Sequence, residues 1–365
     1  MATLVTQPDY AVSSTDAIES RVEVRHATAA EIENWDDVIA SFDNHRLIHR
    51  RAWLESLQAS GQGRPAYLVC TRDNEIVGCW TGMLMKRGPL RMFGSPPPGS
   101  QTLSMGPTFD PECVSEEALI AAGIEYLERE QGIHLIELIG TLDVSAMRRL
   151  GFEGNTVTTH RAVMTPQDPD ATFKNLKTNA RRNVKRAIKL GLEIREVEDE
   201  AFVDEAYEQI QEVCQRRGEA VSFTKQRAIE FFRHMKASGN LLALSVHLPD
   251  NGPSIATGMF TIDGRELLLW QWAHRTEHRW YRPTEFMTWT AMQRGMEAGC
   301  RTFDLMGGGD FKQKFGAEKI TNQHRWIRGR YRWILRAREL AYKGHLLKKK
   351  WTASRGKKAN EEASE

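Results

Sequence analysis

Hydrophobic and polar positions between residues 266 and 316 change period several times, and each change predicts an element. Residues Glu266–Ala273 are mostly apolar, with leucines and two tryptophans, and have the length and composition of a buried strand. After an arginine-rich loop, large apolar residues recur at spacings of three and four, which predicts an amphipathic helix that Gly299 ends: Phe286, Trp289, Met292 and Met296. A second short strand, a glycine turn and a short helix follow, over Cys300–Leu305, Gly307–Gly309 and Phe311–Phe315.

The same patterns predict alternating strands and helices elsewhere in the chain. Before residue 165 we expect a strand, two helices, a hairpin, a helix, a strand and a helix, over residues 21–26, 32–39, 41–57, 66–85, 116–130, 135–139 and 144–150. A segment rich in proline and glycine, residues 87–112, is predicted to be a loop, because Pro96–Pro98 exclude a helix and cannot donate to a sheet. After residue 170 we expect elements over 173–190 (a basic helix), 192–197, 202–217, 225–238, 240–248, 254–262 and 323–334.

A chain of 365 residues is too long for one ordinary core, and the polar segment Thr165–Asp170 is where it divides. The pattern predicts an α/β fold with mixed sheets. Its parts are a lead-in (residues 1–19), a first unit (20–165), a second unit (170–334), and a basic helix with a polar tail (335–365).

Composition narrows the class of protein. With 41% hydrophobic and 27% charged residues, the chain is expected to be globular and soluble. We find no apolar run near the roughly 18 residues that span a bilayer, and no signal peptide at the N-terminus. Five scattered cysteines without a CxxC spacing predict a reduced, cytoplasmic protein without a structural zinc site.

The net charge of +2 hides two basic segments. Residues 174–189 contain seven Lys or Arg and no acid, and residues 325–350 contain ten Lys or Arg and one acid, Glu339. Such segments attract phosphates or anionic lipid, and the alternative is a solvated helix face. The residues we expect in an anion-binding or membrane-binding patch are Lys177, Arg181, Arg182, Lys185, Arg328 and Arg332.

Three motifs carry a resemblance to a known family. They are Arg279-Trp-Tyr-Arg-Pro-Thr284 leading into a helix, Ala298-Gly-Cys-Arg-Thr-Phe-Asp-Leu305, and Gly309-Asp-Phe-Lys-Gln-Lys-Phe-Gly316. Together they resemble the FemAB-like branch of the GNAT acyltransferases that includes the BioF2-like (CelD-like) acetyltransferases. The resemblance covers residues 173–319. It implies two tandem GNAT-like units, each a twisted mixed sheet flanked by helices, that share a central cleft, with a degenerate first unit.

The resemblance also implies where an acyl donor binds. The strand end at Trp272 and Ala273 would offer backbone N–H groups to the acyl carbonyl. The loop and helix start at Arg279, Arg282 and Thr284 would hold the pyrophosphate of acetyl-CoA, and Gly308 and Gly309 could cradle a phosphate. The family fingerprint R/Q-x-x-G-x-G/A lacks its glycines here, which keeps an aminoacyl-tRNA donor open as an alternative.

Four side chains are candidates for catalysis: Asp304 and His274 as a base, Lys312 as a contact to phosphate or oxyanion, and Tyr281 as an acid. Tyr281 is considered as the acid because this chain has Phe311 at the position where the family has a tyrosine. Each has a structural alternative; Asp304, for example, could cap a neighbouring loop. His274 and His278 lie four residues apart without a third ligand, so we expect no metal.

The leading functional hypothesis is acetyl-CoA-dependent N-acetylation of an amino sugar or similar amine in exopolysaccharide or cell-envelope precursor synthesis, as the CelD-like resemblance implies. The protein would be cytoplasmic, with peripheral contact to the anionic inner membrane, and would not bind DNA. One alternative is a FemX-like aminoacyltransferase that uses charged tRNA. Another is a regulatory protein without catalysis that binds an anionic ligand, such as a cyclic dinucleotide, through its arginine-rich C-terminal segment.

Overall fold

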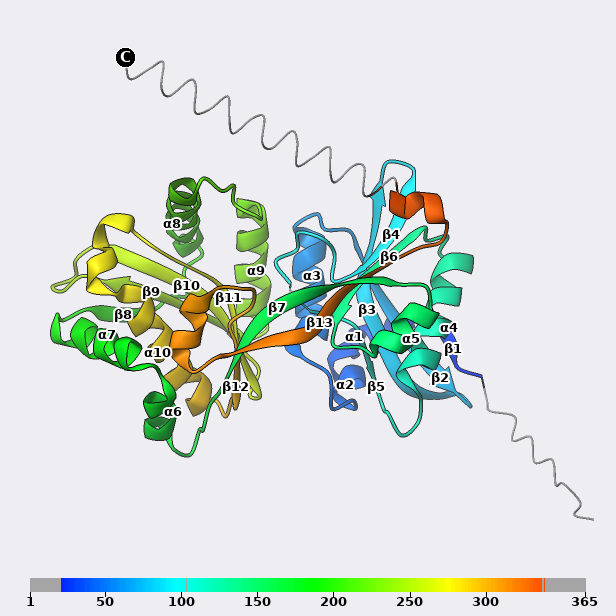
Figure 1. Cartoon of the computed structure of the whole chain (residues 1–365), viewed down its shortest axis with the longest axis horizontal. Coiled ribbons are helices and arrows are strands. Elements are labelled where there is room, and N and C mark those ends of the chain that lie inside the picture. The colour runs from blue at the N-terminus through cyan, green and yellow to red at the C-terminus, as the bar shows by residue number, and fades with distance from the viewer. Residues whose placement is uncertain (1–20, 103, 337, 339–365) are drawn as a thin grey trace, which may run out of the picture.

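A single mixed β-sheet runs through the whole molecule in the computed structural model, which describes residues 21–102, 104–336 and 338. Its 13 strands follow the order β1-β2-β3-β4-β6-β13-β7-β12-β11-β10-β9-β8, and β5 pairs with β3 at the side. Helices flank the sheet in both halves (Figure 1). The predicted α/β class with two tandem units is confirmed.

The first half contains the elements up to β7. Its strands are β1 (Glu23–His26), β2 (Arg64–Arg72), β3 (Glu75–Arg87), β4 (Leu90–Ser95), β5 (Pro107–Phe109), β6 (Leu135–Gly140) and β7 (Glu153–Val163). Its helices are α1 (Ala29–Glu33), α2 (Trp35–Ala40), the 3-10 helix η1 (Leu47–His49), α3 (Arg51–Ala59), α4 (Glu116–Arg129) and α5 (Val144–Arg149).

The second half contains the elements from α6 to β13. Its helices are α6 (Pro169–Asn175), α7 (Thr178–Lys189), α8 (Phe202–Arg217), α9 (Lys225–Ala237), the 3-10 helices η2 (Thr276–Tyr281) and η3 (Asp310–Phe315), and α10 (Pro283–Glu297). Its strands are β8 (Glu193–Glu196), β9 (Leu241–His247), β10 (Ser254–Ile262), β11 (Glu266–His274), β12 (Thr302–Asp304) and β13 (Glu318–Gly329). No helix in the described ranges is both long and apolar enough to cross a membrane.

Several sequence predictions about elements are wrong. The helix expected over residues 32–39 is divided at Asn34 into α1 and α2, and strand β7 was not predicted. The helix expected over residues 41–57 begins only at Arg51, after a turn and η1. The loop expected over residues 87–112 contains β4 and β5, because its apolar residues before Pro96 pair with β3. The basic helix expected over 173–190 is broken into α6 and α7, since Leu176 turns into the core and the Lys177 N–H donates to the Lys314 carbonyl (2.9 Å).

Strands β7 and β13 join the two halves. Strand β13, which ends the second half, pairs with β6 of the first half and with β7. Strand β7, which ends the first half, pairs with β12 of the second half. Both strands run along the middle of the molecule (Figure 1). Each half therefore contributes a strand to the hydrogen bonding of the other.

One hydrophobic cluster also spans both halves. Trp53 of α3 meets Phe231 of α9 edge to face, with 5.5 Å between the ring centroids, and Phe231 stacks on Trp270 of β11 at 4.1 Å. All three side chains are fully or almost fully buried. Since aromatic pairs of this kind stabilise beyond their buried area, the two halves share packing energy as well as strands.

We expect the two halves to unfold as one unit. Leu119 lies fully buried in α4 of the first half, and Leu119→Ala should reduce the free energy of unfolding by about 2–5 kcal/mol. Because of the shared strands and core, hydrogen–deuterium exchange should accelerate in peptides from β10 as well as in those from β3. Exchange that accelerates in β3 while β10 keeps its wild-type protection would show that the halves unfold independently.

Candidate active site

The sheet opens between β11 and β12. Their parallel pairing ends where Leu268 faces Asp304, while β11 continues to His274. A β-bulge lies immediately after this point, because Gln271 pairs with Met259 and Leu269 with Phe260, which leaves Trp270 as the extra residue. Bulges redirect side chains and are frequent next to active sites. The strand expected at Glu266–Ala273 is confirmed, and its end lies beside the opening.

The bulge reverses which face of the sheet each side chain occupies. Leu268 and Trp270 pack in the cluster shared by both halves, and so does Ala273. Trp272 packs on the opposite face, against the core of the second half. There its ring meets Phe311 at 5.8 Å and Phe315 at 6.0 Å between centroids. The predicted donor residues Trp272 and Ala273 thus lie on opposite faces of the sheet at one strand end.

Helix α10 starts beside this strand end. Arg282 is its N-cap and has a left-handed backbone (φ 63°, ψ 42°), the conformation that favours glycine. Arg282 stands at the position of the first fingerprint glycine, so a residue with a side chain adopts a glycine-like conformation at this point of the loop. The Thr284 hydroxyl lies 3.3 Å from Nδ1 of His274 and links the helix start to the end of β11.

The surroundings of His274 favour its neutral form. Burial lowers its pKa below the usual 6.5, and the positive charge of Arg216 lowers it further. A neutral imidazole at physiological pH can accept a proton.

Glu285, in the first turn of α10, is buried, and its charge has a hydrogen-bond donor and a cation nearby. Its carboxylate accepts a hydrogen bond from the Asn183 amide of α7 at 2.9 Å and lies 3.5 Å from Nζ of Lys314. Lys314 in turn lies over the ring of Phe311, 4.4 Å from its centroid. The carboxylate at this helix start therefore has a cation beside it.

Asp304 is part of an ion network that joins the two halves. Its carboxylate accepts hydrogen bonds from Arg46 (3.0 Å), from the Thr159 hydroxyl (2.9 Å) and from the Met306 N–H (2.9 Å). Burial raises the pKa of Asp304, but the charge of Arg46 and these hydrogen bonds outweigh it and bring the pKa below its ordinary value. Asp304 is thus a bound anion, engaged on both oxygens.

Glu266 completes this network from the start of β11. It accepts two hydrogen bonds from Arg46, at 2.7 and 2.8 Å, and Arg161 of β7 lies within 4 Å of both Glu266 and Asp304. Burial raises the pKa of Glu266, and the nearby Asp304 charge adds to the rise. The two carboxylates are therefore driven in opposite directions, Asp304 towards the ionised form and Glu266 towards the protonated form.

Lys312 lies next to the same network and donates to the Met306 carbonyl. Burial lowers its pKa to about 8, and only the charge of Asp304 opposes this. The predicted candidates therefore fall into two groups. Asp304 and Lys312 lie together at the junction of the halves, whereas His274 and Thr284 lie at the helix start, near Tyr281, whose ring packs on Trp280 (3.7 Å).

The predicted anion patch is split by the fold. On α7, Arg182 and Lys185 are exposed, but Arg181 donates to the Leu176 carbonyl at 3.0 Å and Lys177 to the Gln313 side chain at 3.4 Å. Arg328, on β13, pairs with Glu128 and donates to the Leu150 carbonyl (2.9 Å). Arg332 lies in the C-terminal segment and is exposed. Of the basic helix and tail expected over 335–365, all but residues 335, 336 and 338 lies outside the described part of the chain.

The remaining predicted binding residues are open to solvent. Arg279 is exposed, as are Gly308 and Gly309, and a Cβ at either glycine would meet no atom within 4 Å. Gly309 has φ 125°, which a side chain would rarely adopt, so the strand-to-helix turn explains this glycine. Among the described residues, no three His, Cys, Asp or Glu side chains are grouped to hold a metal ion.

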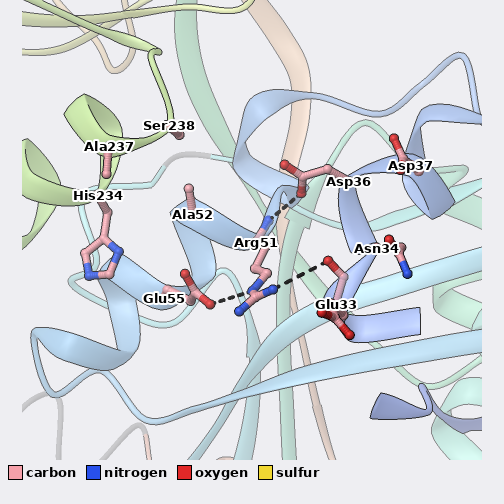
Figure 2. Close-up of a pocket in the computed structure, with 10 residues that line it drawn as sticks. All are labelled: Glu33, Asn34, Asp36, Asp37, Arg51, Ala52, Glu55, His234, Ala237 and Ser238. Carbon is pink, nitrogen blue, oxygen red and sulfur yellow. Dashed lines mark hydrogen bonds and ion pairs between the residues drawn. The ribbon is translucent and has the colours of Figure 1, made fainter. Parts of the chain in front are cut away.

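A well-formed pocket of about 380 Å³ lies elsewhere, between α1–α3 and α9. Figure 2 shows Arg51 in this pocket, with a dashed line to each of three neighbouring residues, Asp36, Glu33 and Glu55. The Arg51 guanidinium pairs with Glu55 at 2.6 Å, and the Arg51 backbone N–H donates to the Asp36 carboxylate at 2.8 Å. The pocket holds none of the candidate transferase residues.

Arg46, Glu266 and Arg161 were not predicted from sequence. Arg46 lies 220 and 258 positions from its two carboxylate partners, and no periodicity reports a contact of that range. The one available signal was a charged residue, Glu266, at the start of a buried strand, because a charge at such a position needs a partner.

Comparison with known proteins identifies one domain. Residues 174–314 match the sequence model of the family described as "Acetyltransferase (GNAT) domain". No curated protein sequence matches the chain.

Solved structures resemble the whole fold. The crystal structure of FemX superposes with a TM-score of 0.67 at 14% identity, over 83% of this chain and 96% of FemX. A tandem GNAT protein from the clavulanic acid biosynthesis pathway gives a TM-score of 0.54 at 13% identity, over 85% of this chain and 98% of that protein. L-PGS from Bacillus licheniformis gives 0.50 at 11% identity, over 85% and 94%. At these identities the likeness concerns the fold.

Removing the central cation of the network should destabilise the protein strongly. We expect Arg46→Gln to reduce the free energy of unfolding by about 3 kcal/mol, because two buried carboxylates lose the cation that is hydrogen-bonded to both, and the remaining arginine, Arg161, lies farther away. Urea unfolding at pH 7 measures the change. Arg51→Gln, which removes an exposed i,i+4 pair with Glu55, is the control and should cost less than about 1 kcal/mol. Equal, small losses in both variants would contradict a structural role for Arg46.

Proposed function

Because residues 174–314 match the model of an acetyltransferase (GNAT) domain, we propose that the chain is an acyltransferase and that it transfers the acetyl group of acetyl-CoA to the amine of an amino sugar. The observation that carries this proposal is the opening of the sheet after Leu268 and Asp304, with the bulge at Trp270 on one side and the start of α10 beside the strand end.

The start of α10 suits the pyrophosphate of the donor. A helix N-terminus presents free N–H groups and the positive end of the helix dipole. Arg282 adopts a glycine-like, left-handed conformation, and exposed Arg279, Arg182 and Lys185 add positive charge on the loop and on α7. Pro283 is the first helical residue, where the missing N–H costs no intrahelical hydrogen bond.

The acyl carbonyl would lie at the end of β11. Backbone N–H groups beyond the bulge no longer face a β12 residue, and such groups can stabilise the oxyanion that forms during acyl transfer. The amine nitrogen attacks the thioester carbonyl carbon, a C–N bond forms, the C–S bond breaks and CoA leaves as a thiolate that takes up a proton. The amine proton passes to His274, directly or through water.

Aromatic side chains support a sugar acceptor. Phe311 is 37% exposed and Trp280 is 46% exposed, and both lie next to the proposed donor site. Exposed aromatic rings beside a polar site can stack on the apolar face of a sugar ring. In the proposed role the acceptor is a precursor in exopolysaccharide or cell-envelope synthesis.

An aminoacyltransferase is the second candidate. The similarity to FemX covers both halves and nearly all of FemX, and the exposed cations of α7 would suit a polyanion such as tRNA. If charged tRNA is the donor, its binding should weaken steeply with salt.

Titration calorimetry with acetyl-CoA tests the donor. We expect saturable binding that Arg282→Gly weakens about five- to tenfold, because glycine keeps the left-handed turn and removes only the charge. Arg282→Ala should weaken it to a similar extent, since alanine, like arginine, carries a Cβ and leaves the strain of the left-handed turn unchanged. Arg301→Gln, at an exposed arginine before β12, is the control and should bind as the wild type does. No heat with acetyl-CoA, together with binding of charged tRNA, would replace the first candidate by the second.

The pH dependence of transfer tests His274 as the base. Because burial lowers its pKa below 6.5, the imidazole becomes half protonated only at a pH below that value. The acid limb of the kcat/KM profile should therefore lie below pH 6.5. His274→Gln should lower kcat/KM about 10²- to 10⁴-fold and abolish this limb. An unchanged profile in the variant would exclude His274 as the base.

A further inference from the structure

A basic pocket of about 530 Å³ lies at the opposite end of the molecule from α7, α10 and η3. In Figure 1 the red-orange C-terminal turns that form one wall lie beside β4 and β6. The lining residues come from β7, β13 and the C-terminal segment: Glu153, Asn155, Ile327, Arg332, Leu335, Arg336 and Arg338. We call this the arginine pocket.

The C-terminal segment, which carries the arginines of the pocket wall, packs on the sheet. Ile334 is fully buried in a small cluster with Met92, Leu135 and Ile327. Arg338 pairs with the buried carboxylate of Glu137 at 3.1 Å. The apolar contact and the ion pair together hold Ile334 and Arg338 over β6 and β13.

The pocket has more cations than anions. Glu137 is shared between Arg338 and Arg325, which lies 3.4 Å from it on β13. Arg332 and Arg336 are exposed, and no carboxylate of a described residue pairs with either. Glu153 is the only acid that lines the pocket among those residues. Two guanidinium groups are thus left to attract an anion, and guanidinium matches phosphate with paired hydrogen bonds.

Two exposed aromatic side chains stand next to these arginines. Tyr331 is 48% exposed and Trp333 is 58% exposed. Aromatic residues with polar edges are favoured where protein meets a membrane interface, and they also stack on flat ligands.

We propose that the arginine pocket binds a ligand through its phosphate groups, as a soluble phosphate ester or as the headgroup of an anionic phospholipid. Arg332 and Arg336 contact the phosphate, and Arg338 is held by Glu137 as part of the wall. The proposal goes beyond the transferase function, since the pocket shares no residue with the strand opening. Arg328 is not part of it, because its guanidinium is engaged by Glu128 and Leu150.

The test compares two double variants of the full chain that remove the same charge. Arg332→Gln/Arg336→Gln changes the pocket, and Arg233→Gln/Arg301→Gln removes two exposed arginines elsewhere, on α9 and before β12. The probes are inorganic pyrophosphate, followed by calorimetry, and vesicles of phosphatidylcholine with an equal amount of phosphatidylglycerol, followed by co-sedimentation. We expect the pocket variant to lose about tenfold or more in affinity for at least one probe and the control to retain it.

The outcome separates the two sources of phosphate. Pyrophosphate binding that depends on the pocket indicates a soluble ligand. Vesicle binding that depends on the pocket, with a blue shift of tryptophan emission that Trp333→Phe removes, indicates a lipid headgroup. Equal losses in both double variants, or no binding of either probe to the wild type, would overturn the proposal. Acetyl-CoA titration of the pocket variant should match the wild type, so failure of this proposal and failure of the transferase proposal are distinguishable.

Discussion

The arrangement of the two halves depends on the ion pairs that Arg46 forms with Glu266 and Asp304. The Arg46 guanidinium donates to Glu266 at the start of β11 and to Asp304 at the end of β12, the two strands whose separation opens the sheet. It also donates to the Ser104 hydroxyl at 2.5 Å, in the segment that follows β4. One cation from the first half thus fixes the geometry of the opening in the second. Because burial makes each of these charges costly alone, they are stable only together.

This network changes which side chain is suited to move a proton. A carboxylate engaged on both oxygens is a poor base, since accepting a proton would break its contacts with Arg46. A neutral His274, at the end of β11, could accept a proton without breaking an ion pair of this kind. In the proposed transfer, Asp304 therefore has the role of a positioning residue that supports β12 and the turn to Met306, and we propose His274 as the residue that takes up the proton.

The sequence predicted those elements whose apolar residues repeat with a single period along the whole element. The apolar run of β11 and the helical spacing of α10 predicted both elements, and the fingerprint position of Arg282 predicted where the helix starts. The bulge at Trp270 was hidden, because both faces of β11 are buried and an extra residue leaves the apolar run unchanged. Strand β4 was hidden by the glycines and prolines around it. The partners of Asp304 were out of reach, since ion pairs across 258 positions leave no periodic trace.

The pairing of β13 with strands of the first half has a consequence during protein synthesis. Strand β6 is complete at Gly140, but its neighbour β13 begins only at Glu318. At roughly 5–20 residues per second, the ribosome needs on the order of ten to forty seconds to supply the missing strand. Until then the edge of β6 presents unpaired N–H and C=O groups and an apolar face, the surface on which strands of other chains aggregate. The nascent first half therefore depends on something to shield that edge, whether a chaperone or the ribosome itself, until its last strand arrives from the far end of the chain.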